Sequence, residues 1–381
     1  MSVDLQSIET LEYKIISKNN KYQLSNIQKH KLKKKFLRSN ILIVGAAGSI
    51  GSKFSKDILR FNAKKIYFLD KDENELTELN RVLNLARSKI EKEYICYDIV
   101  SFNLKKFILK NKINHILNFS ALKHVRSEEN QYSTEHMFAV NSIDFLNIEY
   151  PKSVKSIFSI STDKVNKPTS LLGVSKKLME HTLSEIKNRN KNIFVSTVRF
   201  TNVSFSKGSI LKNVYDKIIS KQVIGIPTKV NRYFITHNEA SSLCMKSMLS
   251  EFDGKIVLPS KKKLLKFFNI KYLSLKIIKA FNLDAVYSKK KLSSRTVLIK
   301  LTNQLSFGQK IIEDLETENE IYYNCNDKSI IFTNLTPLKN YNKIINELKN
   351  NKKINFYTFS KKIYSKFEYL NKNKIKISSK I

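Results

Sequence analysis

The sequence predicts an α/β protein with a doubly wound parallel sheet and a smaller second part interleaved with it. Two observations carry this prediction. The apolar run 41–44 leads directly into a glycine-rich turn, 45–51, and a helical pattern follows over 52–61. Strand-like and helix-like stretches then alternate as far as residue 200, which is typical of βαβ units. After residue 200 the alternation loosens, and this change marks the second part.

The glycine-rich turn predicts a dinucleotide site of the Rossmann type. It holds three of the eight glycines of this 381-residue chain, spaced G-x-x-G-x-x-G. In such a turn the first glycine permits the tight bend, the second lets a pyrophosphate approach, and the third lets helix and strand pack closely. The helix N-terminus offers N–H groups to the phosphates. An ordinary glycine turn is the alternative. We expect the cofactor to contact Gly45, Gly48, Ser49, Ile50 and Gly51.

The remaining elements follow in order. Strands are expected over 41–44, 65–69, 94–97, 115–119, 156–161 and 193–200. Helices are expected over 52–61, 73–88, 103–110, 131–149 and 171–188, and then near 209–221, 238–251 and 271–281. Near the C-terminus, Ile344, Ile345 and Leu348 have helical spacing. This spacing predicts a helix packed on the body, with a membrane-surface helix as the alternative.

We divide the chain into four parts. They are a basic N-terminal extension (1–40), an NAD(P)-binding Rossmann domain (41–204), a mainly substrate-binding part interleaved with the sheet (205–340) and a lysine-rich C-terminal tail (341–381).

The composition favours a reducing, cytoplasmic location. Cys96, Cys244 and Cys325 lie far apart and match neither a metal-binding spacing nor a disulfide framework, so no metal is expected. No apolar run reaches the ~18 residues of a membrane span, and the acidic start of the chain does not resemble a signal peptide.

The net charge of +36 does not identify a partner. Lysine, asparagine and isoleucine are abundant throughout the chain, the basic clusters are dispersed, and no nucleic-acid-binding motif accompanies them. Charge without a motif supports only non-specific binding, so we expect no specific nucleic acid. Peripheral contact with an anionic membrane surface, the inner membrane included, is an alternative.

Acidic residues end two successive strands. Asp70 lies about 20 residues beyond the last glycine of the turn, where an acid binds the ribose hydroxyls of NAD. Lys71 could instead bind the 2′-phosphate of NADP. Asp98 and Ile99 follow the next strand, where an acid can bind the adenine amino group. Helix-cap and turn roles are the alternatives for the two acids.

Six later segments carry a specific resemblance. They are Ser120–Val125, Ser161–Lys164, Pro168–Thr169, Gly173–Lys176, Arg199–Val203 and Arg232–Phe234. In this order they resemble the extended short-chain dehydrogenases/reductases and, within these, the CapD-like polysaccharide-biosynthesis family of UDP-N-acetylglucosamine 4,6-dehydratases. The resemblance runs from about residue 41 to 250, with a weaker echo at 307–310. The A-L-K-H-V and S-T-D-K sequences are its most specific parts.

The resemblance implies dehydration of a UDP-N-acetylhexosamine with bound NAD, or alternatively NADP. In that chemistry a hydride leaves C4, a base removes the C5 proton, an acid protonates the C6 hydroxyl as water leaves, and the hydride returns to C6. It implies Lys164 as the base and Asp163 as the acid. A lysine is a base near neutral pH only where burial or positive charge lowers its pKa. A surface Asp-Lys loop is the alternative.

One departure from the superfamily concerns the proton on the C4 hydroxyl. Lys176 matches the lysine of the Tyr-x-x-x-Lys pair and would bind the nicotinamide ribose. The tyrosine position holds Leu172, which cannot accept a proton. The resemblance leaves Thr162 or a water held by Asp163 as the acceptor. Longer, membrane-attached members of the family look similar in carrying a methionine there.

The resemblance implies further contacts. Ser120 and Lys123 would lie at the cofactor, and Lys123, Asn202, Val203 and Ser209 at the substrate. The family's Arg-Pro-Gly-Glu-Lys is altered here at Ser306, Phe307 and Gln309. Arg232 is therefore expected to bind the UDP diphosphate.

Members of this family are commonly homo-oligomers, and we expect the same here. The alternative functions are a UDP-sugar 4-epimerase, and a non-catalytic dinucleotide-binding protein that attaches to a membrane or polyanion through its basic ends.

Overall fold

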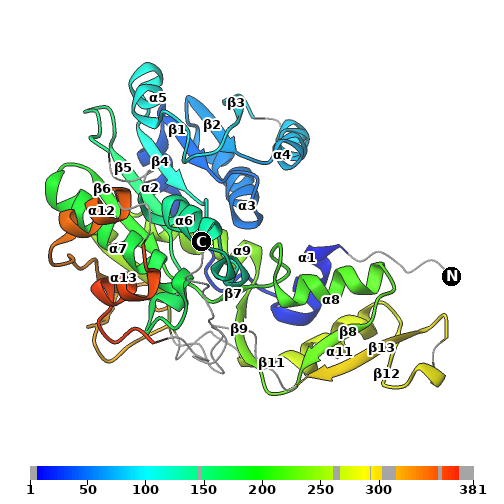
Figure 1. Cartoon of the computed structure of the whole chain (residues 1–381). Coiled ribbons are helices and arrows are strands. Elements are labelled where there is room, and N and C mark those ends of the chain that lie inside the picture. The colour runs from blue at the N-terminus through cyan, green and yellow to red at the C-terminus, as the bar shows by residue number, and fades with distance from the viewer. Residues whose placement is uncertain are drawn as a thin grey trace.

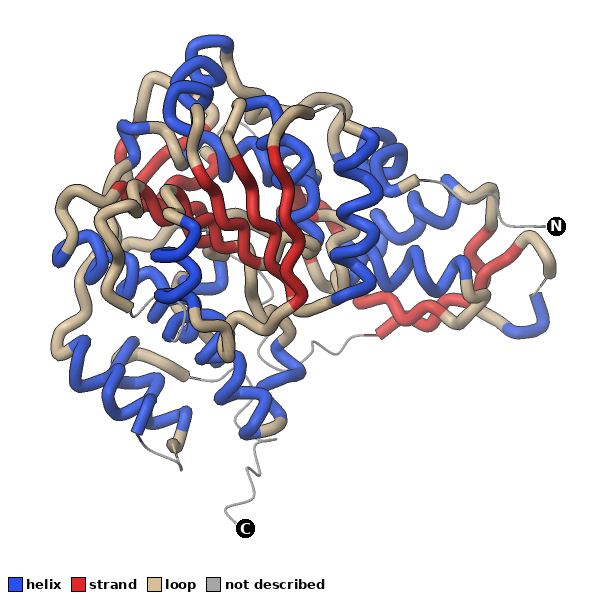
Figure 2. Tube along the Cα trace, turned by 90° about the horizontal axis from the view of Figure 1, so that it is seen from above, coloured by secondary structure: helices blue, strands red, loops and turns tan. Residues whose placement is uncertain are grey.

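The computed structural model describes residues 7–86, 88–143, 148–260, 267–291, 293–302, 315–350 and 354–368. Its centre is a nine-stranded sheet with the order β14-β15-β10-β6-β5-β4-β1-β2-β3 (Figures 1 and 2). The sheet is parallel from β3 to β10, and β15 and β14 close one side antiparallel. The order β3-β2-β1-β4-β5-β6 is that of the Rossmann fold. The predicted fold class is therefore confirmed.

The inner parallel strands are short and mostly buried, as expected of strands covered on both faces, whereas the edge strand β3 carries three charged residues. Their bounds are β1 Asn40–Val44, β2 Lys65–Asp70, β3 Glu91–Cys96, β4 His115–Asn118, β5 Ser156–Ile160, β6 Phe194–Val198 and β10 Lys255–Pro259. The antiparallel pair is β14 Tyr323–Asn324 and β15 Ile330–Asn334.

Alternate residues of each strand face two separate cores, because side chains alternate along a strand. In β1, Ile41 and Ile43 face the core that contains Phe54, whereas Leu42 and Val44 face the core that contains Ile108. Helices supply the other side of each core. They are α3 Ser49–Ile58, α4 Glu73–Leu85, α5 Leu104–Asn111, α7 Leu171–Arg189 and α9 His237–Ser247. The helix α6 Gln131–Phe138 packs in a third core with α7.

The second part projects from the main sheet (lower right in Figure 1). It has two three-stranded sheets, β11-β9-β7 and β12-β13-β8. Their bounds are β7 Asn202–Val203, β8 Ile224–Pro227, β9 Asn231–Ile235, β11 Phe267–Asn269, β12 Asp284–Val286 and β13 Thr296–Thr302, with α8 Ile210–Ile219 and α11 Ile270–Ala280 beside them. The chain returns to the main sheet at β10 and again at β14 and β15, so the two parts are interleaved as predicted.

Both ends of the described chain pack on the body. The N-terminal segment contains α1 Ile8–Leu11, a π-helical turn Glu12–Ile16 and α2 Asn26–Phe36. Its Leu11, Tyr22 and Leu32 are fully buried, so this basic segment is not detached. At the other end, α12 Tyr341–Asn350 and α13 Phe356–Ile363 share a core with α7, and Ile344 and Ile345 are buried there.

Three of the differences between predicted and observed element boundaries illustrate how local structure departs from the sequence pattern. The helix expected from residue 52 begins at Ser49, because Gly48 occupies the N-cap. The helix expected over 131–149 is α-helical only to Phe138 and continues as a π-helix over Ala139–Ile143. The strand expected over 94–97 starts at Glu91, where charged residues on an exposed edge strand conceal it.

Shorter 3₁₀ turns span Leu59–Phe61, Val125–Glu129, Asp163–Val165, Ser250–Phe252 and Lys289–Lys291. Among the described residues, no helix is both long and apolar enough to cross a bilayer. Within the same ranges, no group of three or more His, Cys, Asp or Glu side chains is placed to hold a metal ion.

Candidate active site

The glycine turn is shaped by close backbone contacts. Gly45 has φ +71°, and a Cβ on it would lie 2.5 Å from the backbone nitrogen of Ser120. A Cβ on Gly51 would lie 2.0 Å from the carbonyl oxygen of Gly45. At Gly48, by contrast, a Cβ would meet only that same oxygen at 3.4 Å, an ordinary contact. The first and third glycines are therefore required by the protein's own packing, and the middle one is not.

The start of α3 faces the space beside Gly48. Gly48 is the N-cap, and no side chain caps this helix by hydrogen bonding. An uncapped first turn presents N–H groups and the positive end of the helix dipole. The absent side chain at Gly48 leaves room there. This arrangement fits a dinucleotide pyrophosphate.

Asp70 fastens the turn to the end of β2. Its Oδ2 accepts a hydrogen bond from Ala47 N at 2.9 Å, and its Oδ1 accepts one from Asp72 N at 3.2 Å. Both oxygens keep a second lone pair for the ribose hydroxyls of a nucleotide. Lys71 beside it is exposed. Asp70 therefore lies at the end of β2, as expected from the sequence, and it also holds the glycine turn against that strand.

Asp98 and Ser120 lie beyond the ends of β3 and β4. Asp98 Oδ1 accepts from Val100 N at 2.9 Å, and its Oδ2 lies 3.6 Å from His136 Nε2. Asp98 therefore stabilises a turn, which is the alternative role considered for it. Ser120 donates from both its N and its Oγ to Asn118 Oδ1, at 2.9 and 2.6 Å. Ile99 is buried.

Lys207 lies across the glycine turn, although no motif in the sequence distinguishes it from the other lysines. Its N donates to Ser49 Oγ at 2.9 Å, and its Nζ donates to Ala47 O at 3.4 Å and pairs with Glu75 at 2.6 Å. The next residue, Gly208, has φ +71°, and a Cβ there would lie 2.1 Å from the His124 ring. The segment joining the two parts of the protein therefore contacts the glycine turn directly.

Asp163 and Lys164 follow β5 in a 3₁₀ turn, at the carboxyl edge of the sheet. Lys164 Nζ lies 3.4 Å from Asp163 Oδ1, and Thr162 Oγ1 donates to the same oxygen at 2.9 Å. The Asp163 side chain is only 1% exposed, whereas that of Lys164 is 27% exposed. A buried carboxylic acid thus lies beside a lysine that is partly exposed to solvent.

Lys123 connects this pair to the glycine turn. The residue as a whole is exposed. Surrounding protein nevertheless partly desolvates the ammonium group, and this is the largest cause that lowers its pKa, to about 8. The positive charges of Lys207 and Lys164 lower this pKa further. Lys164 and Lys207, from two other loops, therefore lie within electrostatic reach of Lys123 at the carboxyl edge, where the ligands of open α/β sheets bind.

Lys176 points from α7 to the end of β5. Its Nζ donates to Ile160 O at 3.2 Å. Burial lowers the pKa of this amine to about 7, and the charge of Glu180 opposes that shift. Leu172, in the tyrosine position, is buried.

Glu128, which the sequence did not indicate as a site residue, lies beside Leu172. Its two carboxylate oxygens accept from the N–H groups of Leu171 and Leu172, both at 2.9 Å. Burial nevertheless raises the pKa of Glu128 to about 7. The carboxylate anchors the N-terminus of α7 and with it the turn that carries Leu172.

A buried ion network underlies the Asp163–Lys164 turn. Arg199 is fully buried and binds Glu180 through two hydrogen bonds of 2.7 Å. It also donates to Glu320 at 2.5 and 2.9 Å and to Asn166 Oδ1 at 3.0 Å. Glu180 in turn accepts from Ser161 Oγ at 2.7 Å. Arg199 thus joins both flanks of the turn to the segment just before β14. Arg199 lies in a segment that carries the family resemblance, but no role for it is expected from the sequence.

The expected substrate residues lie around β7 and β9. Asn202 pairs in register with Phe234, and Val203 is buried. Ser209 caps α8 by accepting from Lys212 N at 3.3 Å. Arg232 is buried and donates to Asn231 O at 2.9 Å. Their contacts with a substrate stay predictions. Ser306, Phe307, Gln309 and the echo at 307–310 lie outside the described residues.

This chain is similar to known proteins in both sequence and fold. A family model described as "Polysaccharide biosynthesis protein" matches residues 41–334. A protein of Methanocaldococcus jannaschii called "Uncharacterized membrane protein MJ1061" is 28% identical over 339 residues, which cover 87% of this chain and 96% of that protein. The "Capsular polysaccharide biosynthesis protein CapD" of Staphylococcus aureus is 25% identical over 76% of this chain, but the match spans only 47% of CapD.

A "UDP-N-acetylglucosamine 4,6-dehydratase (inverting)" of Campylobacter jejuni is 25% identical over 59% of this chain and 67% of its own length. Among solved structures, Pen from Bacillus thuringiensis superposes with a TM-score of 0.67 at 21% identity. The match covers 80% of this chain and 89% of Pen. At that identity, the superposition shows a common fold.

Proposed function

The chain belongs to the polysaccharide biosynthesis protein family whose model spans residues 41–334, and we propose that it dehydrates a UDP-N-acetylhexosamine with a bound dinucleotide. The product would be a 4-keto-6-deoxy sugar for surface glycan synthesis. NAD is the proposed cofactor, with NADP as the alternative, and UDP-N-acetylglucosamine is the proposed substrate.

One observation carries this proposal: the Asp163–Lys164 pair and the glycine turn share one edge of the sheet. Lys123 lies within electrostatic reach of both Lys164 and Lys207, and Lys207 is hydrogen-bonded to the glycine turn. An acid–base pair beside a dinucleotide site is what an elimination coupled to hydride transfer requires. An epimerase needs the hydride transfer but not the elimination pair.

A bound dinucleotide would supply reversible hydride acceptance, which oxidises C4 of the sugar and later reduces C6. The rest falls to this chain's residues. Lys164 would remove the C5 proton, which the C4 ketone makes acidic. Asp163 would protonate the departing C6 oxygen, so that water leaves. Because the two side chains interact directly, their proton affinities belong to the pair. General acid–base catalysis of this kind contributes about 10²–10⁴-fold.

The C4 hydroxyl proton needs an acceptor, since Leu172 cannot supply one. Thr162 donates its own hydrogen to Asp163 Oδ1, which leaves a lone pair of its oxygen to accept a proton. We assign Thr162 to this step, with Asp163 as the next group in the relay. Lys176, whose pKa burial lowers, would bind the nicotinamide ribose. Lys123, Asn202, Val203, Ser209 and Arg232 remain the proposed substrate contacts.

Mass spectrometry and NMR of the products from a panel of UDP-sugars test the proposal. We expect a product lighter by one water from UDP-N-acetylglucosamine without added reductant. A C4 epimer of unchanged mass would instead identify a UDP-sugar 4-epimerase. Absence of any product from protein that binds the dinucleotide would refute catalysis of this type.

Lys164→Ala tests the assigned base. We expect turnover to fall by about 10²–10⁴-fold, the share of general acid–base catalysis, while dinucleotide binding is retained. Lys167→Ala is the matched control, because Lys167 is an exposed lysine three residues further along the same loop. Equal losses in the two variants would remove Lys164 from the mechanism.

A further inference from the structure

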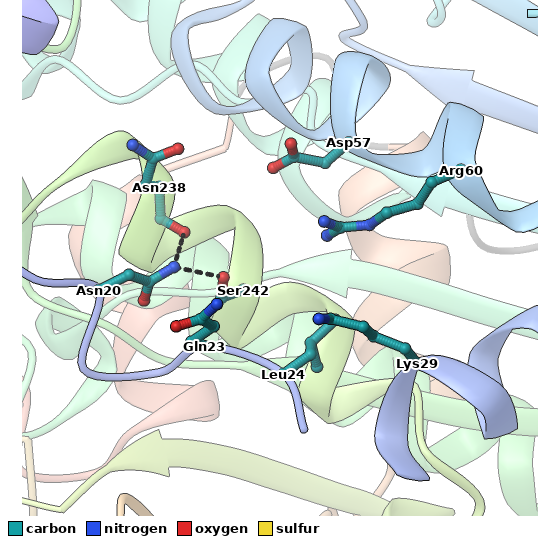
Figure 3. Close-up of a pocket in the computed structure, with 8 residues that line it drawn as sticks. All are labelled: Asn20, Gln23, Leu24, Lys29, Asp57, Arg60, Asn238 and Ser242. Atoms are coloured by element: carbon teal, nitrogen blue, oxygen red, sulfur yellow. Dashed lines mark hydrogen bonds between the residues drawn. The ribbon is translucent and has the colours of Figure 1, made fainter. Parts of the chain in front are cut away.

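A polar pocket of about 240 Å³ lies away from the candidate active site. It is formed between the N-terminal segment, the C-terminal end of α3 and the first turns of α9 (Figure 3). Its lining residues are Asn20, Gln23, Leu24, Lys29, Asp57, Arg60, Asn238 and Ser242. Because α3 begins at the glycine turn, the pocket lies at the other end of the same helix. The mechanism proposed above uses none of its residues.

Two cations extend into this pocket. Figure 3 shows Lys29 from α2 and Arg60 from the turn after α3 reaching into the same space with their nitrogen ends. Within the described part of the chain, neither forms a salt bridge. The guanidinium of Arg60 instead contacts the sulfur of Met245 at 3.2 Å and lies 5.2 Å from the Phe61 ring. Two like charges that converge without a counter-ion repel each other.

The acidic residue of the pocket does not neutralise them. Asp57 Oδ1 pairs with Lys53 at 3.0 Å, and Asp57 Oδ2 accepts from Ser241 Oγ at 2.7 Å. Both oxygens of this carboxylate are therefore engaged with α3 and α9. The Gln23 and Asn238 side-chain amides, which can donate as well as accept hydrogen bonds, line the pocket together with the two cations.

The N-terminal segment holds this shape in place. Asn20 Nδ2 donates to Asn238 O at 3.3 Å and to Ser242 Oγ at 2.8 Å, as Figure 3 shows. Gln28 Nε2 donates to Asp327 at 3.0 Å, one residue before Lys29. Lys29 thus stands on anchored backbone, so less entropy is lost when it binds a ligand.

We propose that this pocket binds a phosphate group. A phosphate offers several acceptor oxygens to a fork-shaped guanidinium and an ammonium. The volume is below the ~300–1,000 Å³ typical of sites for drug-sized ligands, so it suits one phosphate group rather than a whole nucleotide. Its source is either a free phosphate or the headgroup of an anionic phospholipid. The second source is suggested by Ile27, which is 71% exposed on α2. This inference does not rest on the proposed function.

Calorimetric titration of the full-length protein with inorganic phosphate tests the first source. The pocket variant is Lys29→Gln/Arg60→Gln. Its control, Lys33→Gln/Lys56→Gln, removes the same charge from exposed positions of α2 and α3 outside the pocket. Charged hydrogen bonds contribute about 1.5–3 kcal/mol each, so we expect at least a tenfold weaker affinity in the pocket variant and no more than a twofold change in the control. Lys29→Arg/Arg60→Lys should retain binding.

Vesicles of phosphatidylglycerol in phosphatidylcholine test the second source, with thermal unfolding to confirm that every variant is folded. Vesicle binding that the pocket variant loses and the control keeps would support the site with a lipid as its ligand, whether or not free phosphate binds. The proposal is overturned if neither probe binds. It is equally overturned if both double variants lose binding alike, because the attraction would then be the diffuse effect of net charge.

Discussion

The glycine turn and the Asp163–Lys164 turn occupy the same edge of the sheet but are held in different ways. Backbone contacts shape the glycine turn, and its closest one joins Gly51 to Gly45 within the motif itself. Side chains support the other turn, and these come from distant positions, with Arg199 bound to Glu180 and Glu320. The support of a turn fixed by its own backbone can be recognised from the turn's sequence, whereas the partners of a turn fixed by remote charges cannot.

Removing the central charge of the network should have the largest effect. Arg199→Met leaves Glu180 buried without its guanidinium, and breaking a buried ion pair on one side costs about 3–5 kcal/mol. Urea unfolding measures this loss. Arg189→Met is the control, since Arg189 forms a more exposed pair with Glu185 and surface pairs are worth at most about 1 kcal/mol. Equal losses in the two variants would contradict a special role for the network.

Two alanine substitutions separate packing from ligand binding in the glycine turn. Gly51→Ala places a methyl group against the Gly45 carbonyl, and such overpacking costs about 1–3 kcal/mol of stability. Gly48→Ala meets only an ordinary contact, so we expect stability close to wild type and weaker dinucleotide binding. Thermal unfolding and a dinucleotide titration read out the two effects. Similar melting temperatures for both variants would show that the turn relaxes around the added methyl group.

The charge network should also show in the dependence of stability on pH. Burial alone would raise the pKa of Glu320, but hydrogen bonds and charge from Arg199, with the charge of Lys177, hold it well below its usual range. A lowered pKa adds stability above the unfolded-state value near ~4.3, and this is lost as pH falls below it. Between pH 6 and pH 3.5, wild type should lose about 1 kcal/mol more than Glu320→Gln. Parallel curves in urea unfolding would contradict this.

The smallest effect is expected from substituting Lys207, whose side chain contacts the glycine turn from a neighbouring loop. Lys207 contacts Ala47 O and pairs with Glu75 near solvent. Lys207→Gln should weaken dinucleotide binding by no more than about fivefold, in line with the modest energy of exposed charges. Added salt should reduce the difference. A fluorescence titration with the dinucleotide measures the affinity. Lys221→Gln, at an exposed position after α8, serves as the control.

The sequence predicted what depends on local pattern. Apolar runs located the parallel strands, and the glycine spacing located the turn at Gly45, because both features are set by neighbouring residues. The acid at Asp70 followed from its distance to the turn. Its hydrogen bond to Ala47 N was not foreseen, although it is part of the same local unit.

The remainder depends on contacts between distant residues. Nothing near Glu128 indicates that its carboxylate would reach Leu171 and Leu172, more than 40 positions away. Glu320 lies 121 residues from Arg199, and its partner becomes evident only once the sheet has brought β6 and the segment before β14 together. Lys207 likewise looks like one lysine among many until the loop is seen on the glycine turn.

The N-terminal segment has a consequence for how the protein is made. Gln28 finds its partner Asp327 only after 299 further residues exist. At about 5–20 residues per second, a ribosome needs about 15–60 s to produce them. During that interval Leu11, Tyr22 and Leu32, which are fully buried in the finished protein, have no complete surface to cover them. This segment thus leaves the ribosome well before the residues that shelter it, and it is a natural place for a chaperone to bind the growing chain.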